Sequence, residues 1–212
     1  RLRGWQVFVV WVLCAIPVVL GFFLPLAIML RPLGAEAFEP QWPRFFEWAG
    51  NSLTLAALTS ALAVMVALAL GHGLRMQAGW GLRVAARVAG LGYAVPGAVI
   101  VVGLLLPVAW MQQMAPGLRA GYWMTATLLG LVWAYLVRFT AVAMQAVNSG
   151  YARIPVTLDD SARVMGTGSA QLLARVHLPL LRRSLAAAAL LVFVDVMKEL
   201  PATLVLRPFD SD

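Results

Sequence analysis

Residues 158–179 read LDDSARVMGTGSAQLLARVHLP and form the longest polar-bearing segment after a series of apolar runs. Apolar side chains recur at helical spacing in two sets, one before and one after Gly166. The sets are Leu158, Ala162 and Met165, and then Leu172, Leu173 and Val176. This pattern predicts two short amphipathic helices joined by a glycine hinge.

Local signals also predict where these two helices begin and end. Thr157 and Asp160 make a capping-box-like start, and a helix N-terminus favours the two adjacent aspartates of this stretch. Gly166 can take the left-handed conformation that ends the first helix. Ser169 is expected to cap the second helix, and Pro179 is expected to end it before the next apolar run.

The composition of the chain places it in lipid. Hydrophobic residues make up 62% of the 212 residues and charged residues 12%, whereas soluble domains have about 45–50% and about 25%. A soluble core of this size cannot hide so much apolar surface, so we expect a membrane protein. The net charge of +7 then reflects positive cytoplasmic loops rather than binding of nucleic acid. Cys14, the single cysteine, lies in an apolar run and offers no disulfide.

The apolar runs predict five spanning helices, separated by shorter polar segments. The first is uncharged over residues 4–30, which is enough for one tilted span. Residues 31–50 are expected to form a loop with an interfacial aromatic segment, and Asn51 is expected to cap the second helix from Ser52. The later segments are a basic loop that includes residues 75–87, a run over 88–114 broken at Pro96-Gly97, a helix from Tyr122 past Arg138, and a last run over 185–206.

Arginine counting sets the expected orientation. With the N-terminus inside, ten arginines fall on the inner side and four on the outer side. The inner ten include the five at positions 153, 163, 175, 182 and 183, around the hinge stretch. We therefore expect a cytoplasmic N-terminus and a cytoplasmic hinge stretch.

The spacing within the hinge stretch resembles the EAA loop of ABC-importer permeases. That motif has an acidic residue, two small residues, a glycine four positions later and, further on, an aliphatic residue and Leu-Pro. The matching residues here are Asp160, Ser161, Ala162, Gly166, Val176, Leu178 and Pro179. Asp stands for Glu, Ser for the first Ala, and Val for Ile, while the whole spacing holds.

A second resemblance narrows the family. Asn51-Ser52-Leu53 and Val95-Pro96-Gly97 resemble the same permease superfamily, which is MetI-like. Residues 198–203 read KELPAT, and Leu206-Arg207-Pro208 follows. This run is similar to the penultimate helix of ferric-iron permeases, so the resemblance implies ferric iron as the substrate. Related permeases for thiamine, phosphonate, sulfate or polyamine remain the alternative.

The resemblance implies an all-α polytopic helix bundle, within a permease of two six-helix halves that are fused or paired. Residues 1–212 would be one permease domain with five spanning helices, a fragment or half lacking the sixth. Residues 155–180 would be the cytoplasmic coupling loop. ATPase subunits would contact Asp160, Ser161, Ala162, Arg163, Met165 and Gly166. The other implied partners are a periplasmic substrate-binding protein, a second permease half and lipid.

The last apolar run carries Asp195, Lys198 and Glu199. A lipid-facing charge at this depth costs at least about 2.5–3.5 kcal/mol, so we expect all three side chains to face the bundle interior. One interpretation is a structural ion pair, joined by Arg138. The other is a translocation path for a hard cation, because carboxylate oxygens suit ferric iron.

Motifs for catalysis and cofactor binding are absent from the sequence. There is no Walker lysine motif, G-x-S-x-G or H-E-x-x-H. His72 and His177 are far apart, and His177 is expected to be an interfacial side chain rather than a metal ligand. We therefore expect a non-enzymatic chain without a cofactor. A membrane scaffold outside the ABC class and an intramembrane enzyme using Asp195 and Glu199 stay open as other classes.

Overall fold

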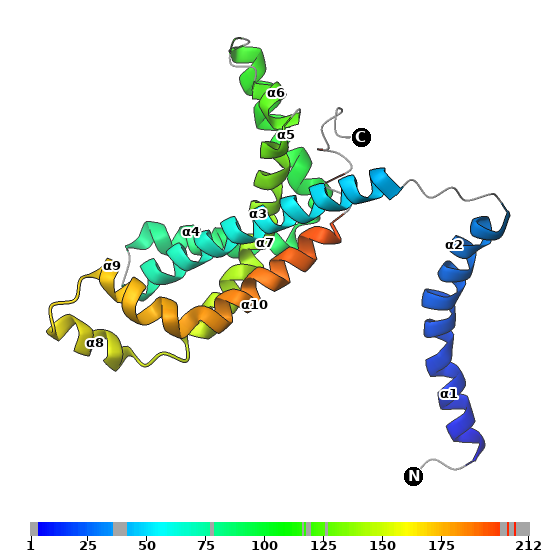
Figure 1. Ribbon diagram of the computed structural model, residues 1–212, viewed down its shortest axis with the longest axis horizontal. Coiled ribbons are helices and arrows are strands. Elements are labelled where there is room, and N and C mark those ends of the chain that lie inside the picture. Colours follow the sequence, from blue (N-terminus) through cyan, green and yellow to red (C-terminus); the bar gives the residue numbers. More distant parts are fainter. Residues whose placement is uncertain are drawn as a thin grey trace. The chain divides into compact units, whose positions relative to one another are not determined.

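The computed structural model describes residues 4–35, 42–76, 79–115, 117, 120–125, 127–199, 203 and 206. These residues form helices joined by short turns, and no strand occurs among them (Figure 1). The expected all-α class is confirmed. The chain divides into two compact units, Arg1–Glu47 and Trp48–Asp212.

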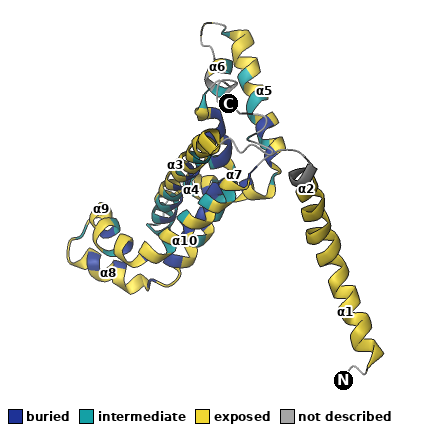
Figure 2. Cartoon of the chain, turned by 45° about the vertical axis from the view of Figure 1, so that its right-hand side comes forward, coloured by how far each residue is buried: buried dark blue, intermediate teal, exposed yellow. Residues whose placement is uncertain are grey.

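The first unit is built around one long apolar helical segment. It comprises α1 (Trp5–Val18), a π-helical turn η1 (Val19–Phe23) and α2 (Leu24–Ala35). Figure 2 shows α1 exposed along its whole length, and none of its residues is buried. A helix with apolar side chains on every face is stable only in an apolar solvent, which agrees with a membrane span.

The helix α3 (Trp42–Arg75) is longer than the sequence predicted. The predicted loop over residues 31–50, with its separate aromatic segment, is wrong at both ends, because α2 continues to Ala35 and α3 begins at Trp42. Asn51 lies inside α3 rather than at its cap. Trp42, Phe45 and Phe46 contact one another because they follow the three- and four-residue spacing of a helix. Pro43 at the first turn costs no internal hydrogen bond.

The predicted basic loop is also largely helical. α3 continues to Arg75 and α4 (Trp80–Leu91) begins four residues after Met76. Arg83 and Arg87 therefore lie on α4. They are four residues apart on one face, which lets them point away from the apolar side of the helix.

The predicted break at Pro96-Gly97 is confirmed. A short turn, η2 (Gly92–Ala94), leads to Val95, which is extended with φ −90° and ψ 129°. This conformation is expected for a residue before proline. α5 (Gly97–Met114) then begins in a new direction.

The helix predicted from Tyr122 is interrupted. α6 (Ala120–Thr125) ends before α7 (Leu128–Tyr151), and the Thr127 side chain caps α7 by accepting the Leu129 N–H at 3.2 Å. Thr127 has an extended backbone, and its side chain takes a backbone N–H as a helix cap does. This explains why α7 begins as a separate helix.

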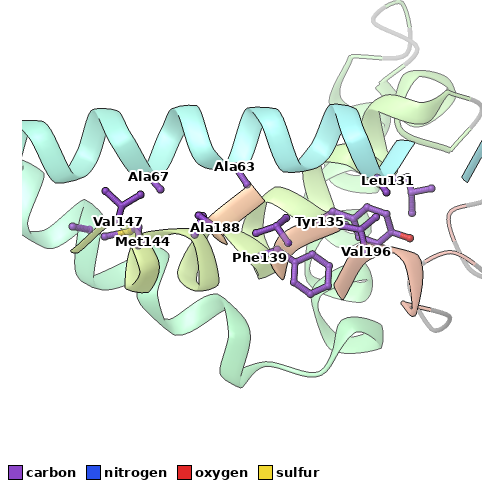
Figure 3. Packing of buried hydrophobic residues seen from close by; sticks show 14 of the residues in the cluster. Ala63, Ala67, Leu131, Tyr135, Phe139, Met144, Val147, Ala188 and Val196 are labelled. Carbon is purple, nitrogen blue, oxygen red and sulfur yellow. The ribbon is translucent and has the colours of Figure 1, made fainter. Parts of the chain in front are cut away.

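The core of the second unit lies around α7, which is packed most extensively against α10 (Leu178–Met197). Small residues allow this contact. A Cβ on Gly150 would lie 2.7 Å from Leu181 Cδ2 and 2.7 Å from Ser184 Oγ. Figure 3 shows Ala63 and Ala67 of α3 directed toward the same core. Close approach through small residues is the usual packing of helices in lipid.

Within the described part of the chain, four helical segments are long and apolar enough to cross a membrane. They are Trp5–Arg31, Trp42–Arg75, Gly97–Met114 and Leu128–Tyr151. The expected fifth span corresponds to α10, which carries Arg182, Arg183 and Asp195 and is not among these four described candidates. The second half of the predicted run, beyond residue 199, lies outside the described residues except for Thr203 and Leu206.

Replacing Gly150 with alanine tests the α7–α10 contact. The added Cβ forces α7 and α10 apart, and overpacking of this kind costs about 1–3 kcal/mol. We expect Gly150→Ala to lower the midpoint of thermal unfolding in detergent. Gly103→Ala in α5 is the control, because a Cβ there meets nothing within 4 Å. Equal midpoints for the two variants would contradict the close packing.

Candidate functional site

The predicted helix–hinge–helix is present. α8 (Val156–Val164) is followed by Met165 and by Gly166, whose φ is +79°, and α9 (Ser169–Leu172) comes next. The Gly166 N–H donates to Arg163 O at 2.9 Å and the Thr167 N–H to Ala162 O at 3.0 Å. These two bonds form a Schellman motif, which requires the left-handed glycine. We call residues 156–172 the hairpin.

The predicted ends of the hairpin helices are wrong in detail. Pro155 precedes α8, and Thr157 lies within the helix. Gly168 is the cap of α9, and Ser169 is its first residue. Pro179 does not end the second helix. The helix passes through a π-helical turn, η4 (Leu173–His177), into α10 without interruption. The π turn changes the hydrogen-bond register immediately before the proline, so the proline no longer breaks the helix.

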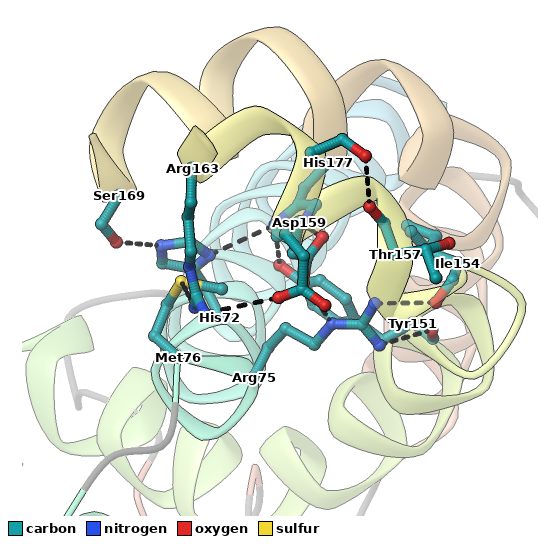
Figure 4. A network of polar contacts seen from close by, with 12 residues as sticks. His72, Arg75, Met76, Tyr151, Ile154, Thr157, Asp159, Arg163, Ser169 and His177 are labelled. Carbon is teal, nitrogen blue, oxygen red and sulfur yellow. Dashed lines mark hydrogen bonds and ion pairs between the residues drawn. The ribbon is translucent and has the colours of Figure 1, made fainter. Parts of the chain in front are cut away.

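A buried carboxylate anchors the hairpin to α3 (Figure 4). Asp159 is 2% exposed. Its Oδ2 accepts from Arg75 Nε at 2.7 Å, and its Oδ1 lies 3.0 Å from His177 Nε2. Arg75 also donates to Ile154 O at 2.7 Å and Tyr151 O at 3.4 Å, at the C-terminus of α7. One arginine and one carboxylate therefore connect α3, α7, α8 and η4.

Asp159 is held in its ionised form. Burial alone would raise the pKa of this carboxyl, but hydrogen bonds and charge from Arg75 and His177 outweigh burial and leave the pKa below its ordinary value. The anchor is therefore fully present above the ordinary carboxyl pKa and is lost only as the pH falls through the lowered value.

The residues predicted to couple to an ATPase divide into one buried and several exposed positions. Ala162 is 5% exposed and packs inward. Asp160 and Arg163 are exposed and form a long ion pair of 3.9 Å. Ser161 is exposed, and its hydroxyl donates to Thr157 O at 2.8 Å. The apolar Met165 is 78% exposed beside the hinge, and the hinge residue Gly166 is exposed as well.

Val164 adds to this exposed apolar tip, because its side chain is 89% exposed. Val164 and Met165 lie next to each other just before the left-handed glycine. These two side chains give the polar hairpin an exposed apolar tip.

Sequence reasoning missed the anchor, although one signal was present. Asp159 and Ala162 are three residues apart and share a helical face, and both are buried. The predicted apolar set of α8 also included Leu158 and Met165, which are exposed. No local pattern connects Arg75 with Asp159, because 84 residues separate them.

A second charged cluster lies at the end of α10. Lys198 Nζ lies 2.7 Å from Asp195 Oδ1, and Arg138 Nη1 lies 3.0 Å from Glu199 Oε1. Side-chain exposure is 13% for Asp195 and 8% for Glu199 but 67% for Lys198. Both carboxylates therefore face inward as predicted, whereas Lys198 does not.

Each of these carboxylates has its own cation. α10 ends at Met197, so Asp195 and Glu199 do not lie on one helical face although they are four residues apart. Among the described residues, no group of three or more His, Cys, Asp or Glu could hold a metal ion. Asp195 also borders an open groove of about 990 Å³ between α4, α7 and α10, together with Tyr93, Asn148 and other residues.

The Arg138–Glu199 pair packs against the bend before α5. A Cβ on Gly97 would overlap Glu199 Oε1 and would lie 2.5 Å from Arg138 Nη1. Tyr135, one helical turn before Arg138, shares a 2.6 Å hydrogen bond with Thr203. The glycine of the Pro-Gly break is therefore required by the ion pair, rather than by the turn alone.

Comparison with known proteins gives one informative similarity. The chain is 29% identical over 157 residues to a curated protein of Streptomyces antibioticus, which is provisionally named an ABC transporter permease. The matched region covers 74% of this chain and 63% of that protein, so it spans less than two thirds of the relative's length. No family model matches the sequence. The similarity supports a permease family.

Replacing Asp159 with asparagine tests the anchor. The amide removes the charge that Arg75 pairs with, and hydrogen bonds to charged groups contribute about 1.5–3 kcal/mol each. We expect Asp159→Asn to speed hydrogen exchange of the amides of residues 156–172 by more than tenfold. Asp160→Asn, one residue away on the exposed side, is the matched control. Similar exchange in the two variants would show that Asp159 does not hold the hairpin.

Proposed function

We propose that this chain is the membrane-spanning subunit of an ABC importer and that the hairpin receives movement from an ATPase. The observation that carries the proposal is the combination of an exposed apolar tip at Val164 and Met165 with a buried anchor at Asp159. The tip offers a surface for a partner, while the anchor ties the same segment to α3. The four long apolar helices and the permease relative support this reading.

Continuous helix joins the hairpin to the part of the chain that is proposed to lie in the membrane. α9, η4 and α10 follow one another without a break from Ser169 to Met197. A displacement of the hairpin therefore tilts α10 directly and shifts α3 through Arg75 and Asp159. In this proposal ATP-driven closure of two ATPase subunits moves the hairpin, and the spanning helices alternate between outward-open and inward-open states. ATP hydrolysis resides in the ATPase subunits, so the chain is not an enzyme.

The proposed complex has further partners. A second permease half, fused or paired, would complete the pathway, and a periplasmic binding protein would deliver the substrate. The proposed location is the bacterial inner membrane with the N-terminus in the cytoplasm. The proposed substrate is ferric iron, on the basis of the KELPAT run at residues 198–203.

Replacing Gly166 with valine tests the coupling role. A β-branched residue at φ +79° is strained by about 1–3 kcal/mol, so the hinge should distort. We expect Gly166→Val to reduce substrate-stimulated ATP hydrolysis and uptake in the reconstituted complex. Gly168→Val is the control, because Gly168 has φ −72° and ψ 162° and nothing lies within 4 Å of its Cβ position. Unchanged substrate-stimulated ATP hydrolysis and uptake in Gly166→Val would contradict the proposal that the hairpin docks onto an ATPase.

Cysteine labelling tests the orientation. On a Cys14→Ser background, a membrane-impermeant thiol reagent applied from outside should label Phe46→Cys but not Gly79→Cys. Both positions are exposed, and the 34 residues of α3 are more than the hydrocarbon core needs. Phe46 near the start of α3 is therefore expected outside the core, where access depends on the side of the membrane. The reverse pattern would invert the topology, and labelling after permeabilisation checks that Gly79→Cys is reactive.

The substrate path is tested by Asp195→Asn and Glu199→Gln, made separately. Glu199 and Arg138 are the more buried pair, and removing one partner of a buried pair is strongly destabilising. We therefore expect Glu199→Gln to impair assembly, and Asp195→Asn to assemble and retain ATP hydrolysis. Loss of iron uptake in assembled Asp195→Asn would support a pathway role. If both variants assemble and keep full iron uptake, neither carboxylate lies on the path.

A further inference from the structure

The two histidines of the chain touch each other at the base of the hairpin (Figure 4). His72 belongs to α3 and His177 to η4, and 105 residues separate them. Their Nδ1 atoms lie 3.4 Å apart, and their ring centroids lie 5.5 Å apart at an interplanar angle of 66°. The outer nitrogen of each ring has its own partner. His177 Nε2 lies 3.0 Å from Asp159 Oδ1, and His72 Nε2 lies 2.9 Å from Ser169 Oγ.

The partners fix where the protons lie. Asp159 is ionised and can only accept, so His177 Nε2 carries a proton. A neutral His177 then has an unprotonated Nδ1, which accepts. His72 Nδ1 must therefore be the donor to His177, and the unprotonated His72 Nε2 accepts from the Ser169 hydroxyl. The hydrogen bonds run in one direction, from Ser169 through both histidines to Asp159.

The charged and polar groups around the two histidines are compatible with hydrogen bonds that run from Ser169 to Asp159. Arg75 of α3 balances the charge of Asp159 of α8 at 2.7 Å. The Tyr151 hydroxyl of α7 lies 3.5 Å from His177 Nδ1 and can donate to the same unprotonated atom. Arg163 of α8 reaches Met76 at 3.4 Å and adds positive charge at the edge of the cluster. His177 itself is fully buried.

One additional proton fits this arrangement and a second does not. A proton on His72 Nε2 is accommodated because the Ser169 hydroxyl can turn and accept. A further proton has only His177 Nδ1 left to occupy. Two N–H groups would then face each other across 3.4 Å, on two positively charged rings, and no hydrogen bond could join them.

We propose that His72 and His177 form a proton-controlled latch, which keeps η4 and the hairpin against α3 with up to one added proton and opens when both rings are charged. The latch itself does not rest on the proposed transport function, because it concerns only the contact between the hairpin and α3. In a working transporter the same latch would make hairpin docking sensitive to acid.

Histidine NMR tests the proton positions. Because the chain has two histidines, ¹⁵N-histidine labelling of the detergent-solubilised protein reports on this pair alone, and His72→Asn assigns the signals. At about pH 7.5, above the ordinary histidine pKa, we expect a proton on His72 Nδ1 and none on His177 Nδ1. Finding Nδ1 protonated on both rings, or on neither, would overturn the latch.

Distance measurements between spin labels test the opening. Labels at Val164→Cys on the hairpin and Trp80→Cys on α4, both exposed positions, are placed on a Cys14→Ser background. We expect a narrow distance distribution at about pH 7.5 and a broader one at about pH 5, which lies below the ordinary histidine pKa. The pKa of Asp159 lies below its ordinary value, so this carboxyl stays ionised throughout.

The control variant is His72→Asn. Its amide nitrogen can stand near the position of His72 Nδ1 and donate to His177, and its amide can turn to accept when His177 is protonated. We expect this variant to keep a narrow distribution at both pH values. Two results would show that the two histidines do not form the latch. One is an unchanged distance distribution at about pH 5 in the protein that keeps both histidines, and the other is equal broadening in His72→Asn.

Discussion

The carboxylate of Asp159 is the group on which the architecture of the second unit depends at its hairpin end. A buried charge is costly unless it is paired and hydrogen-bonded, so Arg75 and His177 must both reach it. Arg75 is the last residue of α3, so it reaches Asp159 only because the helix continues that far. The same guanidinium satisfies carbonyls at the end of α7, where helical carbonyls have no internal partner. The Arg75–Asp159 ion pair therefore fixes the ends of α3 and α7 and the position of the hairpin.

Features that depend on local chemistry were predictable from the sequence. The hinge at Gly166 follows from glycine in a short polar segment, and the break at Pro96 follows from the missing N–H of proline. The start of α3 at Trp42 and the passage of a helix through Pro179 were not predictable in this way. The passage through Pro179 depends on the hydrogen-bond register of the π turn before it, which single-residue preferences do not specify.

The polar clusters show a sharper limit of the sequence. The inward position of Asp195 and Glu199 followed from the cost of a charge in lipid, and the structure confirms it. The cations that pair with these two carboxylates were predicted less fully. The end of α10 at Met197 separates the carboxylates, so each pairs with a different cation. Asp159 was assigned only to a helix N-terminus, while its partners Arg75 and His177 lie 84 and 18 residues away. Pairings over such distances are decided by packing of the whole unit.

The separation between Arg75 and its partners has a consequence for biosynthesis. A chain emerging from the ribosome contains Arg75 long before Asp159 and His177. Until Asp159 has been made, Arg75 lacks its carboxylate partner. Until His177 has been made, Asp159 lacks its second partner, and α8 is not fully held in place. The hairpin is therefore completed late, after the preceding apolar helices are available for insertion. A product truncated within residues 76–158 would leave Arg75 without its carboxylate.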